Sequence, residues 1–564
     1  RPLLACGSSG FGNMTELPTV CDYLVIGSGA AGAVVAARLS EDRDVKVVLL
    51  EAGGRDRSLL LKLPGLGFAV GAHPRYNWSH PTEPIAGMDN RELVFLQGKV
   101  LGGSSSINGM IYTRGHGREY DIWQQMGCRG WGGDDVLEYF KKSEGNERGE
   151  GPWHGGAGPV KVRPARPDVP ICDAFLAAAE AAGFPVLDDL NRDTIDGFGY
   201  YDINAGWARG GGGGRRMSTA TAYLRPLKER QNLVVMSQAM ALRLIIEKGR
   251  ARGAEVSIRG QAATIRAARE VIVCAGAIKT PQLLLLSGIG PADQLRSLDI
   301  NVHHDAPRVG QGLQNHVCYR PQYITNQPVT ADRHLAPLNA IKAGLNYAFR
   351  RQGPLVESYA PAGGFFRTDP GLETPDAQVV LLSALAPTSV SGSRFRIRDL
   401  LPKEHGFGLT IYQGSPHSRG AVTLRSADPW ATPKVAPGYF SDPRDMAVLL
   451  KAVKRMREMM RQPAIARFID REMMPGEHIQ SDAALEVDIR SNGATAYHQC
   501  GTCAMGPGPD AVLDPELRVR GINGLRVADT SIMPRIPNAA LHAPTIMIGE
   551  KAAALIRGIQ SKSG

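Results

Sequence analysis

Residues 22–54 read DYLVIGSGAAGAVVAARLSEDRDVKVVLLEAGG, and this stretch decides the fold. An apolar run ends at Ile26, a glycine-rich turn follows, a segment rich in alanine and valine comes next, and a second apolar run ends at Glu51. This order predicts a strand, a turn, a helix and a strand, with the G-x-G-x-x-G fingerprint of a dinucleotide-binding βαβ unit. The sequence therefore predicts an α/β protein, α+β overall, that contains a Rossmann-like domain.

Each glycine of this turn has a physical role. Gly27 permits the tight turn, Gly29 lets a pyrophosphate approach the backbone at a helix N-terminus, and Gly32 lets the helix pack closely on the strand. Glu51 lies nineteen residues beyond Gly32, where a carboxylate can accept hydrogen bonds from a ribose. An acidic residue at this place disfavours NADP, because it repels a 2′-phosphate, and it leaves NAD and FAD open.

The length and composition of the chain bound its class. With 564 residues, 43% of them hydrophobic, we expect two interlocked domains or one very large one. No uncharged apolar run reaches about 18 residues, so we expect no membrane-spanning segment. The formal charge of +10 is a weak bias over this length, and the basic stretch 451–461 has apolar residues at helical spacing, which indicates a solvated helix face. We therefore expect no nucleic-acid partner.

The cysteines and the first residues bear on location. Eight cysteines are too few for a disulfide-stapled secreted scaffold, so we expect reduced thiols and a cytoplasmic protein. Residues 1–18 are interpreted as a leader or an expression remnant. Cys500 and Cys503 form a C-x-x-C pair, a spacing typical of redox dithiols and of half a zinc site. Because no second pair stands at a matching distance, we expect no metal.

Further segments, taken with residues 22–54, resemble one known family. They are QGKVLGGSSSINGMIYTRG at 97–115, GAIKTPQLLLLSGIG at 276–290, NW at 77–78 with TEP at 82–84, STATAYLRP at 218–226, VGQGLQNH at 309–316, HQCGTCAMG at 498–506, GLRVADTSIMP at 524–534 and HAPTIMIGEKAA at 542–553. From about residue 22 to the C-terminus the chain resembles the glucose-methanol-choline (GMC) oxidoreductases. Within that family it is most similar to the bacterial choline-dehydrogenase-like and L-sorbose-dehydrogenase-like alcohol dehydrogenases.

This resemblance implies an FAD enzyme with two interleaved domains. The Rossmann-like FAD-binding domain is expected from residues 19–160, 218–316 and 497–564, and the substrate-binding domain, built on a large mixed sheet, from 161–217 and 317–496. By the same resemblance Trp78 and Ala241 lie near the adenine, Gly103 and Asn108 near the isoalloxazine and pyrophosphate, and Asp529 near the phosphates or ribityl chain. The cofactor-binding residues implied are Gly27, Gly29, Ala31, Gly32, Glu51, Ala52, Trp78, Gly103, Asn108, Ala241, Asp529, Pro544 and Thr545.

The family also implies how the flavin is held. Some members attach it covalently through a histidine in the GGS loop. Ile107 occupies that place in this chain, so we expect non-covalent, dissociable FAD.

Oxidation of an alcohol needs removal of the hydroxyl proton and transfer of a hydride, in this family to flavin N5. Imidazole suits the first step because its unperturbed pKa is near neutral. By the resemblance His498 is the catalytic base and His542 holds the substrate oxygen, a place where the choline and sorbose relatives usually have Asn. We expect a structural or supporting role for His316. His73, His80, His303 and His304 are expected on surface loops.

The substrate and the electron acceptor are less constrained. Residues 317–410 offer no carboxylate cluster for a quaternary ammonium group, and aromatics are only 6% of the chain, so we expect an uncharged primary or secondary alcohol. The small Ala496 favours a dehydrogenase that passes electrons to a quinone or dye. The alternatives are an oxidase that uses O₂ and makes H₂O₂, and a flavin-dependent hydroxynitrile lyase or photodecarboxylase of the same fold.

Two further features complete the expectations. The run Gly210 to Gly214 predicts a mobile loop, because five glycines cannot pack and lose much entropy on ordering. Both a monomer and a homodimer are compatible with the sequence.

Overall fold

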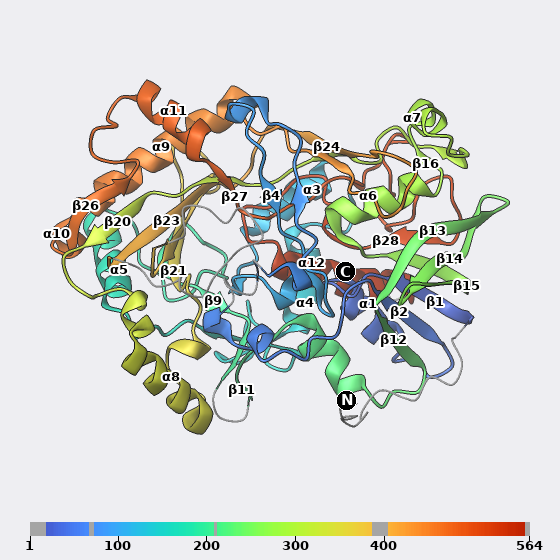
Figure 1. The fold of residues 1–564 in the computed structure, drawn as a ribbon, viewed down its shortest axis with the longest axis horizontal. Helices are drawn as coiled ribbons and strands as arrows, with labels where there is room; N and C mark the ends of the chain where they lie inside the picture. Colours follow the sequence, from blue (N-terminus) through green and yellow to red (C-terminus); the bar gives the residue numbers. More distant parts are fainter. Residues whose placement is uncertain (1–18, 67–70, 72, 208–210, 386–403, 559–564) are drawn as a thin grey trace, which may run out of the picture.

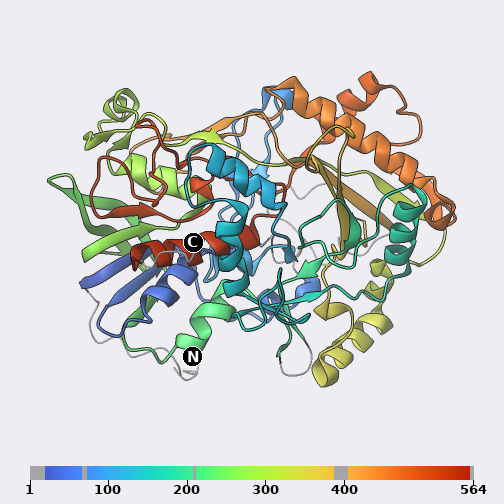
Figure 2. The same ribbon diagram turned by 180° about the vertical axis from the view of Figure 1, so that it is seen from behind.

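The computed structural model describes residues 19–66, 71, 73–207, 211–385 and 404–558. Within them the chain forms two seven-stranded sheets that lie side by side, each with its own helices (Figure 1). One sheet and its helices occupy the right of Figure 1 and the other the left. Residues 20–51, near the start of the chain, and the C-terminal helix at 542–556 lie together in the part that contains the first sheet, so distant segments of the chain combine in one layer (Figures 1 and 2).

The first sheet contains the predicted βαβ unit and confirms the α/β fold class. Its strands are β12(Leu233–Ser237), β2(Val47–Glu51), β1(Val20–Ile26), β15(Gln261–Val273), β14(Arg250–Ile258) and β13(Ala239–Glu247) in this order, with β28(Leu525–Val527) beside β15. β12, β2, β1, β15 and β28 run parallel, while β13, β14 and β15 form an antiparallel meander. β2 is buried along its whole length, as is usual for a parallel strand covered on both faces.

Three helices begin near the same edge of this sheet. α1(Gly32–Leu39) follows β1, α6(Gly276–Leu286) follows β15, and α12(His542–Ile556) packs against α1 and against α4(Gly133–Ser143). α12 is buried along most of its length because most of its residues are small or apolar, and the buried carboxylate of Glu550 is paired with Arg38 and Lys142. Helix N-termini carry unpaired N–H groups and a partial positive charge, so this edge favours an anionic ligand.

The second sheet is large, as expected, but its pairing is not mixed. Its strands are β21(Ala362–Phe366), β22(Ala377–Leu382), β23(Gly406–Gln413), β19(Val317–Tyr319) and β27(Ala494–Thr495), with β20(Gln322–Thr325) between β23 and β26(Ile469–Met474). All pairs described are antiparallel. β21, β22 and β23 are neighbours in sequence and in the sheet, and they reverse direction at each step without the helical crossover that parallel strands require.

Helices cover the second sheet. α9(Pro443–Met460) packs against β22 and β23, and α5(Pro170–Ala181) packs against α9. The basic stretch at 451–461 lies on α9, where Lys451 and Lys454 are exposed as predicted. Arg457 differs, because it is buried and its guanidinium is paired with the carboxylate of Glu472.

Further helices and strands are described outside the two large sheets and the helices named above. The helices are α3(Gly117–Gln125), α7(Ala292–Ser297), α8(Pro337–Arg350), α10(Pro463–Ala466) and α11(Asp482–Asn492); the strands are β3(His80–Pro81), β4(Val94–Phe95), β5(Ile111–Tyr112), β6(Glu144–Asn146), β7(Val160–Pro164), β8(Gly197–Tyr200), β9(Asp202–Ile203), β16(Ile289–Gly290), β17(His304–Asp305), β18(Gln311–Leu313), β24(Gly420–Thr423) and β25(Lys434–Ala436). No helix of the described residues is long and apolar enough to cross a membrane.

The glycine run departs from its prediction. Gly210 lies outside the described residues, but Gly211–Arg216 form strand β11, which pairs with β10(Ala205–Trp207). Backbone hydrogen bonds of a strand need no side chains, and the strand ends at Arg216, whose buried guanidinium is hydrogen-bonded to Asn108. The predicted loop is therefore a strand over Gly211–Arg216.

Candidate active site

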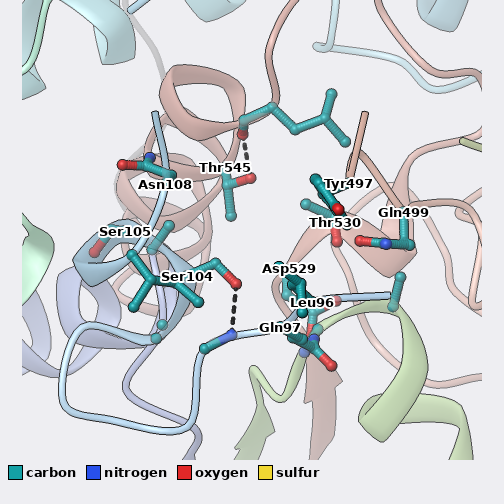
Figure 3. A pocket seen from close by; sticks show the side chains of 18 of the residues that line it. Leu96, Gln97, Ser104, Ser105, Asn108, Tyr497, Gln499, Asp529, Thr530 and Thr545 are labelled. Carbon is teal, nitrogen blue, oxygen red and sulfur yellow. Dashed lines mark hydrogen bonds between the residues drawn. The ribbon is translucent and has the colours of Figure 1, made fainter. Parts of the chain in front are cut away.

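A cavity of about 410 Å³ lies between the two sheets. The carboxyl ends of β1 and β15 contribute Gly27 and Cys274 to its wall, and the second sheet contributes Val380, Thr410 and Tyr412. Ligands of open α/β sheets bind beyond the carboxyl ends of the strands, so the cavity stands where the βαβ unit places a dinucleotide. Figure 3 shows Asn108, Ser104 and Thr545 on one side of the cavity and Tyr497, Gln499 and Asp529 on the other.

Most of the residues that the resemblance implied for FAD and for catalysis line this cavity. The lining contains Gly27, Gly29, Ala31, Glu51, Ala52, Trp78, Gly103, Asn108, Ala241, Asp529 and Thr545, together with His498 and His542. Two implied cofactor residues are not in the lining. Gly32 packs against the turn, where an added Cβ would lie 1.9 Å from the Gly27 carbonyl oxygen, and Pro544 is buried in the first turn of α12.

The glycines of the cavity wall form a cradle that fits a pyrophosphate. Gly27 has a φ of +101°, and its added Cβ would lie 2.4 Å from the carbonyl oxygen of Cys274. An added Cβ at Gly29 would meet no atom closer than 4.0 Å, so this part of the turn faces open space. At Gly103 it would lie 2.7 Å from the Cα of Gly29, so only glycine lets the two loops meet. Backbone N–H groups at a helix start are suited to phosphate oxygens.

Glu51 is oriented at the end of β2 by neighbouring donors. Its Oε2 accepts from the hydroxyl and the backbone N–H of Ser28, at 2.6 and 3.2 Å, and its Oε1 accepts from the Gly53 N–H at 2.8 Å. Burial is the main influence on its pKa, which is raised. Each carboxylate oxygen has more than one acceptor site, so the arrangement leaves room for a ribose hydroxyl.

Cations gather around Trp78 at one end of the cavity. The Nζ atoms of Lys99 and Lys279 lie 4.2 and 4.4 Å from the centroid of the indole ring. Burial and the charge of Lys99 lower the pKa of Lys279 to about 8. His80 stacks beside Trp78 and is fully buried, so its expected place on a surface loop is wrong. Burial lowers its pKa to about 3.

Asp529 binds the chain itself at the start of α6. Its Oδ2 accepts from the Gly276 N–H at 2.8 Å and from the Thr280 hydroxyl at 2.6 Å, and its Oδ1 accepts from the Ser531 N–H at 2.8 Å. These bonds fix the C-terminal segment against the N-terminus of α6, beside the cavity. The segment that follows β28 is thereby held in the cavity wall.

A chain of three hydrogen-bonding groups sets the protonation of His498. The Nδ1 atoms of His498 and His316 are 2.9 Å apart, and Nε2 of His316 is 2.9 Å from the Gly414 carbonyl oxygen. Because a carbonyl can only accept, Nε2 of His316 carries the hydrogen and its Nδ1 is an acceptor. Nδ1 of His498 must then donate, which leaves Nε2 of His498 with a free lone pair.

Burial keeps both of these imidazoles neutral. It lowers the pKa of His316 to about 4, and burial together with the neighbouring His316 lowers the pKa of His498 well below its ordinary value. His316 also stacks on Tyr412, with ring centroids 4.9 Å apart, and the backbone N–H of His498 donates to Asn315 at 2.7 Å. The unprotonated nitrogen of His498 is therefore present at neutral pH in a fixed ring.

His542 is the first residue of α12. Its Nε2 is buried and has no hydrogen-bond partner in the described part of the chain. Burial and the charge of Arg216 lower its pKa to about 3, so its imidazole is also neutral. A buried polar atom without a partner is uncommon in proteins and marks a place where a ligand atom fits.

Two arginines, the buried Arg216 and the half-buried Arg320, were not anticipated from the sequence. Arg216 donates from Nη1 to the backbone oxygen and to Oδ1 of Asn108, at 2.7 and 2.6 Å, so the amide N–H₂ of Asn108 is turned away from it. Arg320 directly follows β19 and lines the cavity. Neither arginine lies in a motif that the sequence offers, because burial of a cation depends on the segments packed around it.

The CGTC pair is placed in the core of the first sheet. Cys500 and Cys503 are fully buried free thiols, and burial raises the pKa of each. In the described residues no group of three or more His, Cys, Asp or Glu side chains is arranged to hold a metal.

Comparison with known proteins defines the class. The family models of the GMC oxidoreductase N- and C-terminal domains match residues 21–318 and 416–549. The oxygen-dependent choline dehydrogenase of Sinorhizobium fredii is 40% identical over 541 residues, which is 96% of each chain. The chain belongs to the GMC oxidoreductase family, and it is an FAD-dependent enzyme that acts on CH–OH donors.

Solved structures agree with this class. Pyridoxine 4-oxidase from Mesorbium loti superposes with a TM-score of 0.84 and 29% identity, over 96% of this chain and all of that one. A formate oxidase variant from Aspergillus oryzae, described for its FAD modification, superposes with a TM-score of 0.88 and 25% identity, over 96% of this chain and 98% of that one.

Proposed function

We propose that this protein oxidises a small alcohol to the aldehyde or ketone, with His498 as the base that removes the hydroxyl proton. One observation supports the proposal. His498 and His542 line the same cavity, the Nε2 of His498 is unprotonated because His316 accepts from its Nδ1–H, and the buried Nε2 of His542 has no partner in the described residues. A base and a second polar nitrogen at one cavity are what an alcohol oxidation needs.

The residues divide the reaction between them. The glycine cradle and Glu51 would hold FAD, which would supply the acceptor for the hydride that leaves the alcohol carbon. His498 takes the hydroxyl proton at Nε2, and the imidazolium formed is stabilised through Nδ1–H by His316. His542 holds the alcohol oxygen by donating to it as negative charge develops. The carbon–oxygen bond becomes a carbonyl, because the carbon loses a hydride while the oxygen loses a proton.

The first experiment is an anaerobic titration of the flavin-loaded protein with a panel of primary and secondary alcohols. We expect at least one alcohol to bleach the flavin absorbance, since only an oxidoreductase transfers a hydride. Cyanohydrin cleavage or light-driven decarboxylation with no bleaching by any alcohol would contradict the proposal. These outcomes would assign the protein to the lyase or photodecarboxylase alternatives.

For the acceptor we propose a quinone or dye-like compound, supported by the small Ala496 in the cavity wall. The name of the Sinorhizobium relative includes oxygen dependence, and this favours O₂ as a second candidate. Turnover with a quinone in place of air should be at least several times faster than turnover in air. Stoichiometric H₂O₂ at the full rate in air would establish the oxidase instead.

We also propose that FAD is bound non-covalently. Ile107 follows the 103–106 turn and lines the cavity, and its aliphatic side chain has no atom that can bond to the flavin. Acid precipitation should leave the yellow colour in the supernatant. A yellow pellet would show a covalent link.

A further inference from the structure

The cavity has a cationic end toward the second sheet. Arg320, Tyr359 and Tyr497 line it there, next to Thr410 and Tyr412. The acidic side chains of the lining are Glu51 and Asp529, and both belong to the first sheet and its neighbouring segments. No carboxylate of the described lining residues therefore lies at this end. The positive charge of Arg320 would repel a substrate that carries an ammonium group.

Arg320 lacks a carboxylate partner in the described part of the chain. Its Nη2 donates to the Thr495 carbonyl at 3.2 Å, and its side chain is also hydrogen-bonded to Tyr497 and Cys318, while its Nε is buried without a hydrogen-bond partner. A guanidinium stays charged under all ordinary conditions and has five N–H donors. A partly buried cation with neutral partners and one unsatisfied buried donor is costly, unless an anion completes its hydrogen bonds.

The surroundings of Arg320 connect it to the reacting groups. Its charge acts on Tyr359 and on Tyr497, which directly precedes His498. The hydroxyl of Tyr359 stands near the Asn108 loop, 3.2 Å from where a Cβ of Gly109 would be. The guanidinium is distant from the base in sequence, but it interacts with Tyr497, the residue before the base, and Arg320 and His498 line the same cavity.

We propose that Arg320 is an anion subsite, and that the substrate is a small alcohol that carries a carboxylate. This inference rests on the proposed alcohol oxidation and names its substrate class. The fork of a guanidinium matches a carboxylate in a bidentate geometry. Arg320 is the one arginine among the described residues that line the cavity, and one guanidinium suits a monoanion better than a phosphate ester, which carries close to two negative charges. The uncharged alcohol expected from the sequence and the choline named for the rhizobial relatives would both leave Arg320 unsatisfied.

The test compares matched substrates on the flavin-loaded protein. The probes are ω-hydroxycarboxylates of two to six carbons, their methyl esters, and choline, each assayed for anaerobic flavin bleaching and for kcat/KM. We expect the best hydroxycarboxylate to exceed its own methyl ester by at least tenfold in kcat/KM, and choline to be the poorest substrate. A methyl ester with the same kcat/KM as its acid, or a higher kcat/KM for choline, would contradict the anion subsite.

Variants separate the subsite from a structural role. In Arg320→Gln, kcat/KM for the hydroxycarboxylate should fall to the value for its methyl ester, and KM for the hydroxycarboxylate should rise. The kcat/KM for the methyl ester should stay the same. Arg320→Lys should restore part of the preference, because it keeps the charge without the fork. The matched control is Arg296→Gln, an exposed residue on α7 paired with Asp293. Equal losses on acid and ester in Arg320→Gln would show that Arg320 only supports the Thr495 segment.

A binding measurement keeps the two proposals apart. Unreactive carboxylates of the same length, such as butyrate, should inhibit competitively and shift the flavin spectrum in the wild type, but not in Arg320→Gln. If no alcohol bleaches the flavin yet butyrate binds through Arg320, the oxidation fails and the subsite stands. If neutral alcohols bleach it and butyrate has no effect, the subsite fails and the oxidation stands.

Discussion

His316 acts on the proposed reaction through His498, whose tautomer it sets. Its ring is bonded on one side to a backbone carbonyl, which can never donate, and on the other to His498. This fixed acceptor determines which nitrogen of His498 carries the hydrogen. The supporting role expected for His316 is consistent with this geometry, in which it is a positioning residue that touches neither substrate nor cofactor.

Replacement of His316 tests that role. We expect His316→Ala to lower kcat by about 10- to 100-fold with little change in KM, because His498 loses the acceptor that holds its ring and tautomer. His316→Gln can accept at Oε1 and donate at Nε2, so it should recover part of the loss. Steady-state kinetics of both variants, with flavin content as a control, check the prediction. A purely structural role would raise KM and release flavin in both variants alike.

Among elements, the turn and helix that follow β1 show how tightly local geometry is fixed. Gly32 begins α1 at a point where any side chain would contact the Gly27 carbonyl. Gly344 is also a helical glycine, in the exposed part of α8, and an added Cβ there would meet nothing within 4 Å. The same residue type therefore has opposite significance in two helices.

Alanine at these two positions should give opposite results. We expect Gly32→Ala to destabilise the protein by about 2–3 kcal/mol and to release FAD, because the turn must move to make room. Gly344→Ala should stabilise it by about 0.5–1 kcal/mol through reduced chain entropy. Urea unfolding and flavin retention of the two variants measure this. If Gly32→Ala has wild-type stability and flavin content, the turn tolerates a larger distance between α1 and β1.

For the whole molecule, a buried ionic network ties β6 to the segment around residue 189. Nε2 of His154 is 2.7 Å from Asp189, and its Nδ1 is 3.3 Å from Glu144. Burial acts to lower the pKa of His154, but the two carboxylates outweigh it and raise the pKa to about 9. The folded protein therefore holds this proton more tightly than the unfolded chain, whose histidine has an ordinary pKa near 6.5.

This difference predicts how stability depends on pH. The contribution of His154 is complete below about pH 6.5 and is lost as the pH rises through about 9, since the unfolded chain then no longer carries the proton. The wild type should exceed His154→Gln in thermal midpoint at pH 6, and this gap should shrink toward pH 10. A gap that stays constant with pH would indicate a role in packing alone.

The sequence by itself determined the parts of the protein that local chemistry fixes. The glycine turn, the βαβ unit and the placement of Glu51 follow from backbone requirements within some thirty residues, and the structure has them as predicted. The family segments indicated most of the cavity wall, although the domain boundaries, the location and the oligomeric state stay predictions.

Only the tertiary structure decided the features that depend on contacts between distant segments. His316 meets His498 across 182 positions of the chain, and the burial of His80 and Arg216 comes from segments packed around them. The glycine run became strand β11 beside β10, and the second sheet is antiparallel throughout its described pairs. Burial and hydrogen-bond partners set the charge and tautomer of a side chain, and a sequence does not contain these quantities until the chain has folded.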